Sequence, residues 1–255
     1  MSVRSRSPPS KKKDHSLLEK LDPFTYVDDY ILPRLNPSGN EIVNWAVYIV
    51  FSFVFAYSLY SIFGFILQTA SPLVIVVSGS MLPTMARGDV VVLQGVDGSH
   101  LNVPEVVLDG VDVRNSSLLE LADISPAGEG GWNITFKQNA QTIFVPKRGT
   151  SDIVVYNSSH KRLEIIHRAV VKIRSNGEYF VLTKGDNNPN LDQDCGKVDT
   201  VLVPGNSAPQ IITTKSCPSP YPVSLDEVRG KALVWAPYLG YIKLLLVDSW
   251  QNARI

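Results

Sequence analysis

The 255-residue sequence predicts a mainly β domain that follows one N-terminal transmembrane helix. Three observations support this fold class. No charged side chain occurs between Glu41 and Arg87, and the first half of this stretch is strongly apolar. Beyond it, short β-branched runs are bounded by Gly, Pro, Asn or Ser, a pattern typical of strands joined by irregular loops. No run of comparable strength with helical periodicity follows the apolar stretch.

The transmembrane helix is expected over Trp45–Leu67. At 1.5 Å per residue this segment extends about 34 Å, enough to cross a hydrocarbon core of about 30 Å. A buried core helix rarely runs this long without one charge. A cleavable signal peptide fits poorly as well, because the apolar run is too long and a long N-terminal segment precedes it.

The basic N-terminus predicts the orientation of the helix. Residues 1–20 carry six basic side chains against two acidic ones, so the positive-inside rule places residues 1–44 in the cytoplasm and residues 68–255 outside. The first ten residues, rich in Ser, Pro and Arg, are expected to be disordered. Over the whole chain 24 basic and 24 acidic side chains cancel, which argues against a nucleic-acid-binding protein.

The exterior domain contains seven runs that predict strands. They are Leu73–Val77, Asp89–Leu93, Ile153–Tyr156, Leu163–Ile173, Tyr179–Thr183, Val201–Val203 and Lys231–Trp235. Residues 102–146 are polar with few strong strand signals, and we interpret them as a surface insertion. Glycosylation sequons occur at Asn115, Asn133 and Asn157 and are compatible with an exterior location. The last apolar stretch, Ala232–Val247, is short for a second span and predicts a terminal strand followed by a membrane-surface segment.

Three short blocks carry the candidate chemistry. The first, Ser78–Thr84 (SGSMLPT), follows an apolar strand, and a serine in a Gly-flanked turn can lie beside a backbone N–H that holds an oxyanion. The second contains His167, which alone among four histidines lies inside an apolar strand; a neutral imidazole can accept a serine proton. The third, Lys184–Asp192 (KGDNNPNLD), offers Asp186 or Asp192 to orient that imidazole. Taken singly, each block has a plain structural explanation. The first fits an ordinary turn, the second a buried core histidine, and the third an Asx turn.

Together, in the order Ser, His, Asp, the blocks closely resemble type I signal peptidases of the endoplasmic-reticulum and archaeal branch. The serine motif of that family reads Ser-Gly-Ser-Met-x-Pro-Thr with Arg-Gly-Asp shortly after, and residues 78–89 match it. The His-Arg block and Lys-Gly-Asp-Asn-Asn match the same branch, whereas the bacterial branch has a catalytic lysine where this sequence has His167. The segment from Arg229 to Tyr241 resembles the family's last strand. The resemblance covers roughly residues 45–95 and 150–243.

The resemblance implies a signal-peptidase-type β fold and a membrane-anchored serine endopeptidase that removes signal peptides from exported preproteins. Ser80 would be the nucleophile and His167 the general base, with Asp186 and Asp192 supporting them. Ser78 and Ser80 would line the oxyanion hole. The substrate is expected to pair with a strand edge such as Leu73–Val77 and to place small residues in shallow pockets.

Partners and location follow from the same resemblance. The implied partners are signal peptides of exported preproteins, the lipid bilayer and a protein translocase; no metal or organic cofactor is implied. The chain would be a single-pass membrane protein, and its insertion and long tail favour an archaeal plasma membrane over the endoplasmic reticulum.

Two departures from the branch and two rival functions accompany this interpretation. Leu82 stands where the branch often has Glu, and Leu191-Asp192 stands where it usually has two aspartates, so Asp194 is an alternative to Asp192. One rival is a Ser-Lys hydrolase with Lys184 or Lys172 as the base. The other is a non-catalytic exterior β domain, such as an adhesin or an assembly subunit.

The two cysteines, Cys195 and Cys217, are too few for a disulfide scaffold or a four-cysteine zinc site. On the exterior side a bridge between them is chemically allowed, and two free thiols are the alternative. A bridge would contribute about 3 kcal/mol by the chain-entropy model.

Overall fold

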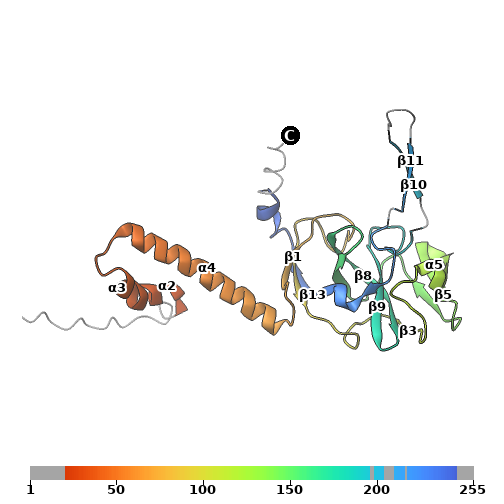
Figure 1. Ribbon diagram of the computed structural model, residues 1–255, viewed down its shortest axis with the longest axis horizontal. Helices are drawn as coiled ribbons and strands as arrows, with labels where there is room; N and C mark the ends of the chain where they lie inside the picture. Colours follow the sequence, from red (N-terminus) through yellow and green to blue (C-terminus); the bar gives the residue numbers. More distant parts are fainter. Residues whose placement is uncertain (1–20, 196–197, 204–209, 216, 246–255) are drawn as a thin grey trace, which may run out of the picture. The chain divides into compact units, whose positions relative to one another are not determined.

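The computed structural model describes residues 21–195, 198–203, 210–215 and 217–245, and the chain divides into two compact units, residues 1–62 and 63–255. In the first unit, a short helical segment precedes the long helix α4 (Glu41–Ile66). It consists of α2 (Pro23–Tyr26), a π-helical turn (Val27–Ile31) and α3 (Leu32–Leu35) (Figure 1). The Asp22 side chain caps α2 by accepting a hydrogen bond from the amide of Phe24. This segment falls within residues 1–44, for which the sequence predicts only a tail.

Among the residues described, α4 is the one helix long and apolar enough to cross a membrane. None of the residues in its most apolar 18-residue stretch is buried. The carboxamide oxygen of Asn40 accepts a hydrogen bond from the amide of Ile42 and so caps the first turn. The 26 residues of α4 extend about 39 Å, more than the thickness of a hydrocarbon core. The helix contains nearly all of the predicted segment Trp45–Leu67 and begins one turn before it.

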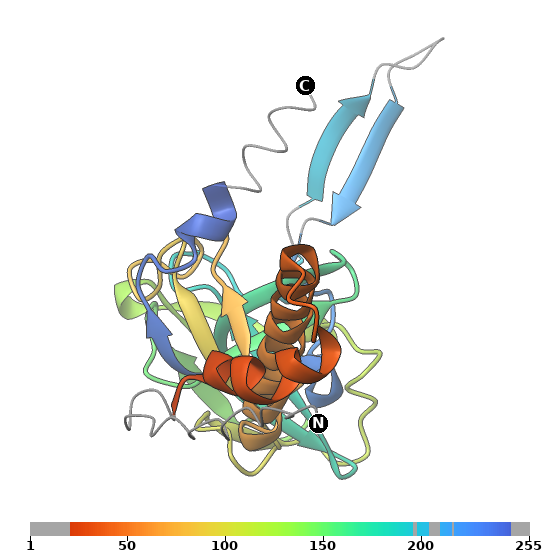
Figure 2. The ribbon, with the colours of Figure 1, turned by 90° about the vertical axis from the view of Figure 1, so that its left-hand side faces the viewer.

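The second unit is built on an eight-stranded sheet, so the prediction of a mainly β fold is confirmed. Seven strands follow one another in the order β1 (Leu73–Ile75), β2 (Val90–Gln94), β13 (Val228–Ala236), β7 (Ile153–Ser158), β8 (Leu163–Ser175), β9 (Glu178–Lys184) and β12 (Val223–Ser224). These neighbours are antiparallel, whereas β3 (Glu105–Val107) pairs in parallel with β8. The late strand β13 lies between β2 and β7, and β1 and β2 are the orange and yellow strands side by side in Figure 2.

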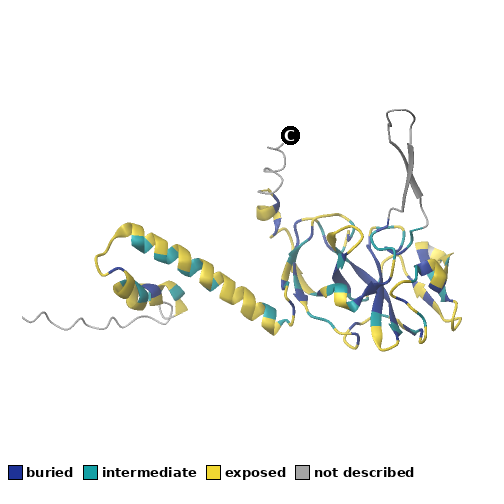
Figure 3. Ribbon diagram, viewed as in Figure 1, coloured by how far each residue is buried: buried dark blue, intermediate teal, exposed yellow. Residues whose placement is uncertain are grey.

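The middle of this sheet is its most deeply buried part. From His167 to Ile173 every residue of β8 is buried, and β9 is buried from Phe180 onward (Figure 3). Both strands are conspicuous in the sequence because each contains a short apolar run, Ala169–Val171 in β8 and Tyr179–Leu182 in β9. A polar side chain at this depth requires a hydrogen-bond partner. His167 and Thr183 lie on these strands, and both have one.

The segment predicted as a surface insertion with few strands forms a second sheet. After the short helix α5 (Leu118–Leu121), the strands β4 (Ala122–Ala127), β5 (Gly131–Phe136) and β6 (Thr142–Val145) pair antiparallel in that order. A 3₁₀ turn (Gly128–Gly130) joins β4 to β5. Ser117 and Glu120 form a capping box at the start of α5.

This three-stranded sheet is part of the core rather than an appendage. Ile134 and Phe136 of β5 are fully buried and belong to the same hydrophobic cluster as Val171 of β8, Leu182 of β9 and Leu191. Because side chains alternate along a strand, Asn133 and Thr135 lie on the opposite face of β5. Residues 102–146 thus contribute to the core instead of only decorating the domain, because apolar side chains at every second position of β5 pack against the main sheet.

Two further segments complete the unit. The strands β10 (Val198–Val203) and β11 (Gln210–Lys215) form an antiparallel hairpin between Cys195 and Cys217, which are joined by a disulfide with a Cα–Cα distance of 5.1 Å. Of the alternatives that the sequence allowed, the structure therefore contains the bridge. After β12 a 3₁₀ turn (Leu225–Glu227) leads into β13. Beyond β13, residues 241–245 are helical, so the terminal strand is followed by a helical turn.

Candidate active site

The serine block forms a compact loop between β1 and β2. The backbone of Val76 closes the loop at its base, donating to the carbonyl of Asp89 at 2.9 Å and accepting from the amide of Gly88 at 2.8 Å. Met81 and Met85 are fully buried beneath the loop and pack against Val91. Burial of the residue that follows Ser80 holds the serine at the surface of the domain, where it is only partly buried.

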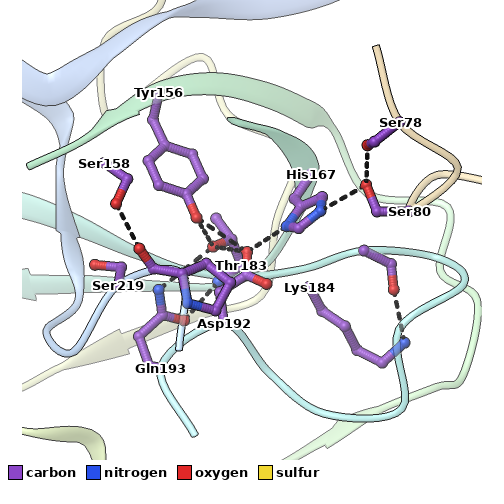
Figure 4. A network of polar contacts seen from close by, with 12 residues as sticks. Ser78, Ser80, Tyr156, Ser158, His167, Thr183, Lys184, Asp192, Gln193 and Ser219 are labelled. Carbon is purple, nitrogen blue, oxygen red and sulfur yellow. Dashed lines mark hydrogen bonds and ion pairs between the residues drawn. The ribbon is translucent and has the colours of Figure 1, made fainter. Parts of the chain in front are cut away.

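Ser80, His167 and Asp192 lie in a row (Figure 4). The Oγ of Ser80 is 2.9 Å from Nε2 of His167, and Nδ1 of His167 is 2.5 Å from Oδ2 of Asp192. His167 comes from β8 and Asp192 from the loop that follows β9, so the row depends on the pairing of these two strands. A neutral imidazole that donates from Nδ1 to a carboxylate presents an acceptor at Nε2, which is the arrangement that a serine hydroxyl requires.

The carboxylate of Asp192 is held by two more donors. Besides His167, its Oδ2 accepts hydrogen bonds from the hydroxyl of Thr183 at 2.7 Å and from that of Tyr156 at 3.1 Å. Burial and the charge of Asp192 raise the pKa of Tyr156, so the phenol stays protonated and donates. The side chain of Gln193 accepts a hydrogen bond from the amide of Thr183 and donates one to the hydroxyl of Thr183. These two bonds fix the position of the Thr183 side chain. Asp192 therefore has a fixed position and is almost fully buried.

Asp186 lies in the same loop but contacts other groups. Its two oxygens accept hydrogen bonds from Nε and an Nη of Arg168 at 2.8 and 2.7 Å, and Oδ2 also accepts from the hydroxyl of Thr84 at 2.5 Å. Burial raises the pKa of Asp186, but the hydrogen bonds from Arg168 and Thr84 and the guanidinium charge outweigh it and lower the pKa overall. The structure thus places Asp192 at His167 and Asp186 between Arg168 and the serine loop.

Gly185 and Asn187, on either side of Asp186, contact the backbone of the serine loop. The amide of Asn187 donates to the carbonyl of Ser80 at 2.8 Å, and its side-chain amide donates to the carbonyl of Gly79 at 3.2 Å. A Cβ at Gly185 would lie 2.8 Å from the carbonyl oxygen of Ser80, so the close approach requires glycine. The Lys-Gly-Asp-Asn-Asn block therefore fixes the loop that carries the serine.

Ser78 lies beside the hydroxyl of Ser80. Its Oγ is 3.1 Å from Oγ of Ser80, and the residue is exposed (Figure 4). The sequence predicts that Ser78 and Ser80 line an oxyanion hole, and the structure brings these two residues together.

The two lysines of the rival mechanism have partners of their own. The ammonium of Lys184 donates to the carbonyls of Lys147 at 2.9 Å and Gly185 at 3.1 Å, and burial lowers its pKa. The ammonium of Lys172 donates to the carbonyl of Gly98 at 2.7 Å and pairs with Glu105 at 2.9 Å. The nitrogen that meets Oγ of Ser80 belongs to His167.

A cavity of about 300 Å³ opens next to the serine. It lies between the edge strand β1 and the first half of β8, and apolar side chains line most of it. The lining residues are Val74, Ile75, Val77, Ser78, Ser80, Val155, Leu163, Glu164, Ile165, Ile166 and His167. In the described part of the chain no group of three or more His, Cys, Asp or Glu side chains could hold a metal ion.

Several residues of this site were missed by sequence reasoning. Arg168 lies in the block that contains His167, and Asn187 lies in the Lys-Gly-Asp-Asn-Asn block. Their positions within these motifs were the one signal in the sequence that they belong to the site. Thr183 adjoins the third block. Tyr156, in contrast, lies on β7 in an apolar run that contains none of the three motifs. It reaches Asp192 because β7 pairs with β8, a relation that no local pattern in the sequence reveals.

Comparison with known proteins identifies relatives of the chain. No family model matches it. It is similar to the signal peptidase complex catalytic subunit of Schizosaccharomyces pombe, at 28% identity over 193 residues that cover 76% of each chain. The subunit of the same name from Candida tropicalis is 24% identical over 204 residues, 79% of this chain and 82% of that one. An uncharacterised protein of Methanocaldococcus jannaschii is 27% identical over 198 residues, 69% of this chain and 84% of that one.

Proposed function

We propose that this chain, a homologue of signal peptidase catalytic subunits, is a membrane-anchored serine endopeptidase that removes signal peptides from exported preproteins. The observation that carries the proposal is the row of contacts from Ser80 through His167 to Asp192, with distances of 2.9 and 2.5 Å. This row belongs to a chain related to signal peptidases over most of its length.

The row of contacts supports nucleophilic catalysis by Ser80. As Oγ attacks the scissile carbonyl, its proton moves to Nε2 of His167. The imidazolium that forms is stabilised by Asp192, which the hydroxyls of Thr183 and Tyr156 keep in place. His167 then gives the proton to the leaving amine, and an acyl-enzyme remains on Ser80. Water, activated by the same imidazole, hydrolyses the acyl-enzyme and restores the serine.

The oxyanion of each tetrahedral intermediate needs donors on the side away from His167. We assign these to the backbone N–H of Ser80 and the hydroxyl of Ser78. The exposed hydroxyl of Ser78 lies 3.1 Å from Oγ of Ser80, which supports this assignment.

The substrate is proposed to bind as an extended strand along β1. This strand is at the end of the sheet order, where it pairs with β2, and its residues Val74 and Ile75 line the cavity beside Ser80. An added strand would gain main-chain hydrogen bonds there and would place alternate side chains in the cavity. The mostly apolar lining suits the small residues that precede a signal-peptide cleavage site.

We propose that α4 crosses the membrane once, with the N-terminal segment in the cytoplasm and the catalytic unit outside in an archaeal plasma membrane. The basic side chains within residues 1–20 support this orientation. Exposed apolar side chains near the end of β13 and just beyond it support contact of the catalytic unit with the bilayer: Leu233, Val234, Trp235, Tyr238, Leu239 and Ile242. A signal peptide released from a protein translocase would reach Ser80 on the same side.

Incubation of the detergent-solubilised full chain with a preprotein tests the function. We expect the wild type to release the mature protein, and Ser80→Ala to leave the preprotein intact while its thermal unfolding is unchanged. Ser99→Ala, which removes an exposed hydroxyl outside the site, is the matched control and should cleave like the wild type. Unaltered cleavage by Ser80→Ala would refute the assignment.

A further inference from the structure

A hydrogen bond joins the small sheet to the loop that carries the two aspartates. The indole N–H of Trp132, on β5, donates to the carbonyl of Pro189 at 2.9 Å. Trp132 lies two residues before Ile134 and four before Phe136, so its side chain lies on the same face of β5 as these two buried side chains. It packs against the cluster that they belong to. Its side chain is therefore on the face of β5 that meets the main sheet.

Pro189 lies between the two parts of the loop that contact the site, Asp186 and Asn187 before it and Asp192 after it. On one side, Asn187 donates to the carbonyl of Ser80 and Asp186 binds Thr84. On the other side, Asp192 binds His167, and its amide donates to the carbonyl of Thr183 at 2.8 Å. A displacement of this loop would thus move the serine and the carboxylate relative to the imidazole.

A second contact with the small sheet lies two residues further along. Leu191 is buried and packs in the cluster that contains Ile134 and Phe136. Pro189 itself is exposed, so its carbonyl would be solvated without the indole. The small sheet thus contacts the loop with one hydrogen bond and one buried side chain, directly before Asp192.

We propose that Trp132 is a positioning residue for the reaction, and that the small sheet serves the active site by fixing the loop from Gly185 to Asp192. This inference rests on the proposed function, because it assigns the loop to the same peptidase reaction. Misplacement of reacting groups by a fraction of an ångström lowers the rate of a step without necessarily weakening substrate binding.

Trp132→Phe tests the inference in the full-length, detergent-solubilised protein, because it removes the donor and keeps an aromatic ring in the core. The matched control is Thr135→Val on the same strand. It removes the hydrogen bond between Thr135 and Thr142, at 2.9 Å, on the face of β5 that points away from the loop. Each variant is measured by preprotein cleavage, thermal unfolding and amide hydrogen exchange.

We expect Trp132→Phe to lower kcat about fivefold and to leave KM within about twofold, the size expected for loss of one neutral hydrogen bond. The amides of Asn187 and Asp192 should exchange about fivefold faster, whereas amides of β7 and β8 keep their protection. Thr135→Val should match the wild type in kcat and in exchange of the loop.

Two results would overturn the inference. One is an unchanged kcat together with unchanged exchange of the loop in Trp132→Phe. The other is an equal loss in both variants with faster exchange throughout the domain, which would indicate general destabilisation. Exchange requires no substrate, so a wild type that cleaves no preprotein would refute the proposed function, while the exchange of the loop amides would still decide whether Trp132 fixes the loop.

Discussion

Asp186 and Asp192 lie in one short loop and hold different partners. Asp192 accepts from His167, Thr183 and Tyr156, whereas Asp186 accepts from Arg168 and Thr84. The sequence predicts both as candidates to orient the imidazole, because either could follow a strand next to His167. Their separation in space decides between them: one carboxylate faces the imidazole and the other faces the loop that carries Ser80.

Asparagine at each position separates the two roles. Asp192→Asn should lower kcat by at least about 100-fold, since Asn substitution in a Ser-His-Asp set leaves the imidazole in the wrong tautomer and without a counter-charge. Asp186→Asn should instead lower stability by about 3 kcal/mol, because the guanidinium of Arg168 would be buried without a partner charge. Steady-state kinetics and chemical unfolding of both variants check this. Equal losses of kcat in the two variants would contradict it.

Asp186 also makes stability depend on pH. Burial raises its pKa, but Arg168 and Thr84 lower it more, so the folded-state pKa lies below the ordinary 3.8. A group of this kind contributes stability that is fully present above the unfolded pKa and is lost as the pH falls through the folded one. Below about pH 4 the wild type should therefore lose stability more steeply than Asp186→Asn. Unfolding midpoints measured from pH 6 to pH 3 test this, and parallel curves would count against it.

At the scale of elements, sequence patterns identified most strands of the eight-stranded sheet and missed the three strands of the small sheet, although β5 is buried in the core. The runs that correspond to β7, β8 and β9 are rich in β-branched and other apolar residues and lie in the middle of the sheet. The strand β4 reads ADISPA, with a proline and polar residues, and in the described part of the chain it pairs with β5 alone. In the N-terminal segment, α2 and α3 are four residues each, too short for a periodic pattern.

Local sequence patterns also could not predict the order of the strands in the sheet. Nothing in the segment Val228–Ala236 indicates that it lies between β2 and β7. The sequence motifs alone predicted that Ser80 and His167 act together, and the structure brings Oγ of Ser80 within 2.9 Å of Nε2 of His167. The contact of Tyr156 with Asp192 depends on strand register, and the choice of Asp192 over Asp194 as the partner of His167 depends on the path of the loop.

The small sheet should behave as part of the core. Phe136 is fully buried in the cluster shared with β8 and β9, so Phe136→Ala should lower the free energy of unfolding by about 3–5 kcal/mol. Thr135→Val, one residue away on the other face, should change it by less than about 0.5 kcal/mol. Chemical unfolding of the full chain in detergent measures both. A small effect of Phe136→Ala would mean that the sheet is a surface insertion after all.

At the scale of the whole molecule, one apolar helix precedes a catalytic unit with its own core, and each is compact by itself. The disulfide between Cys195 and Cys217 is consistent with a unit outside the cytoplasm, since such bonds persist in oxidising compartments. The bridge lies close in sequence to Asp192 and restricts the chain between β9 and β12. By the chain-entropy model it contributes about 3 kcal/mol.

The most direct test of the account is the rate of preprotein cleavage by His167→Ala, measured beside Lys184→Ala and Lys172→Ala in the full chain. If His167 is the general base, as we propose, His167→Ala should lose nearly all turnover. The lysine variants should keep most of it, within about twofold of the wild type, because the ammonium groups bind carbonyls and Glu105 rather than Ser80. An essential lysine with a dispensable His167 would contradict the account and would assign the reaction to a Ser-Lys mechanism.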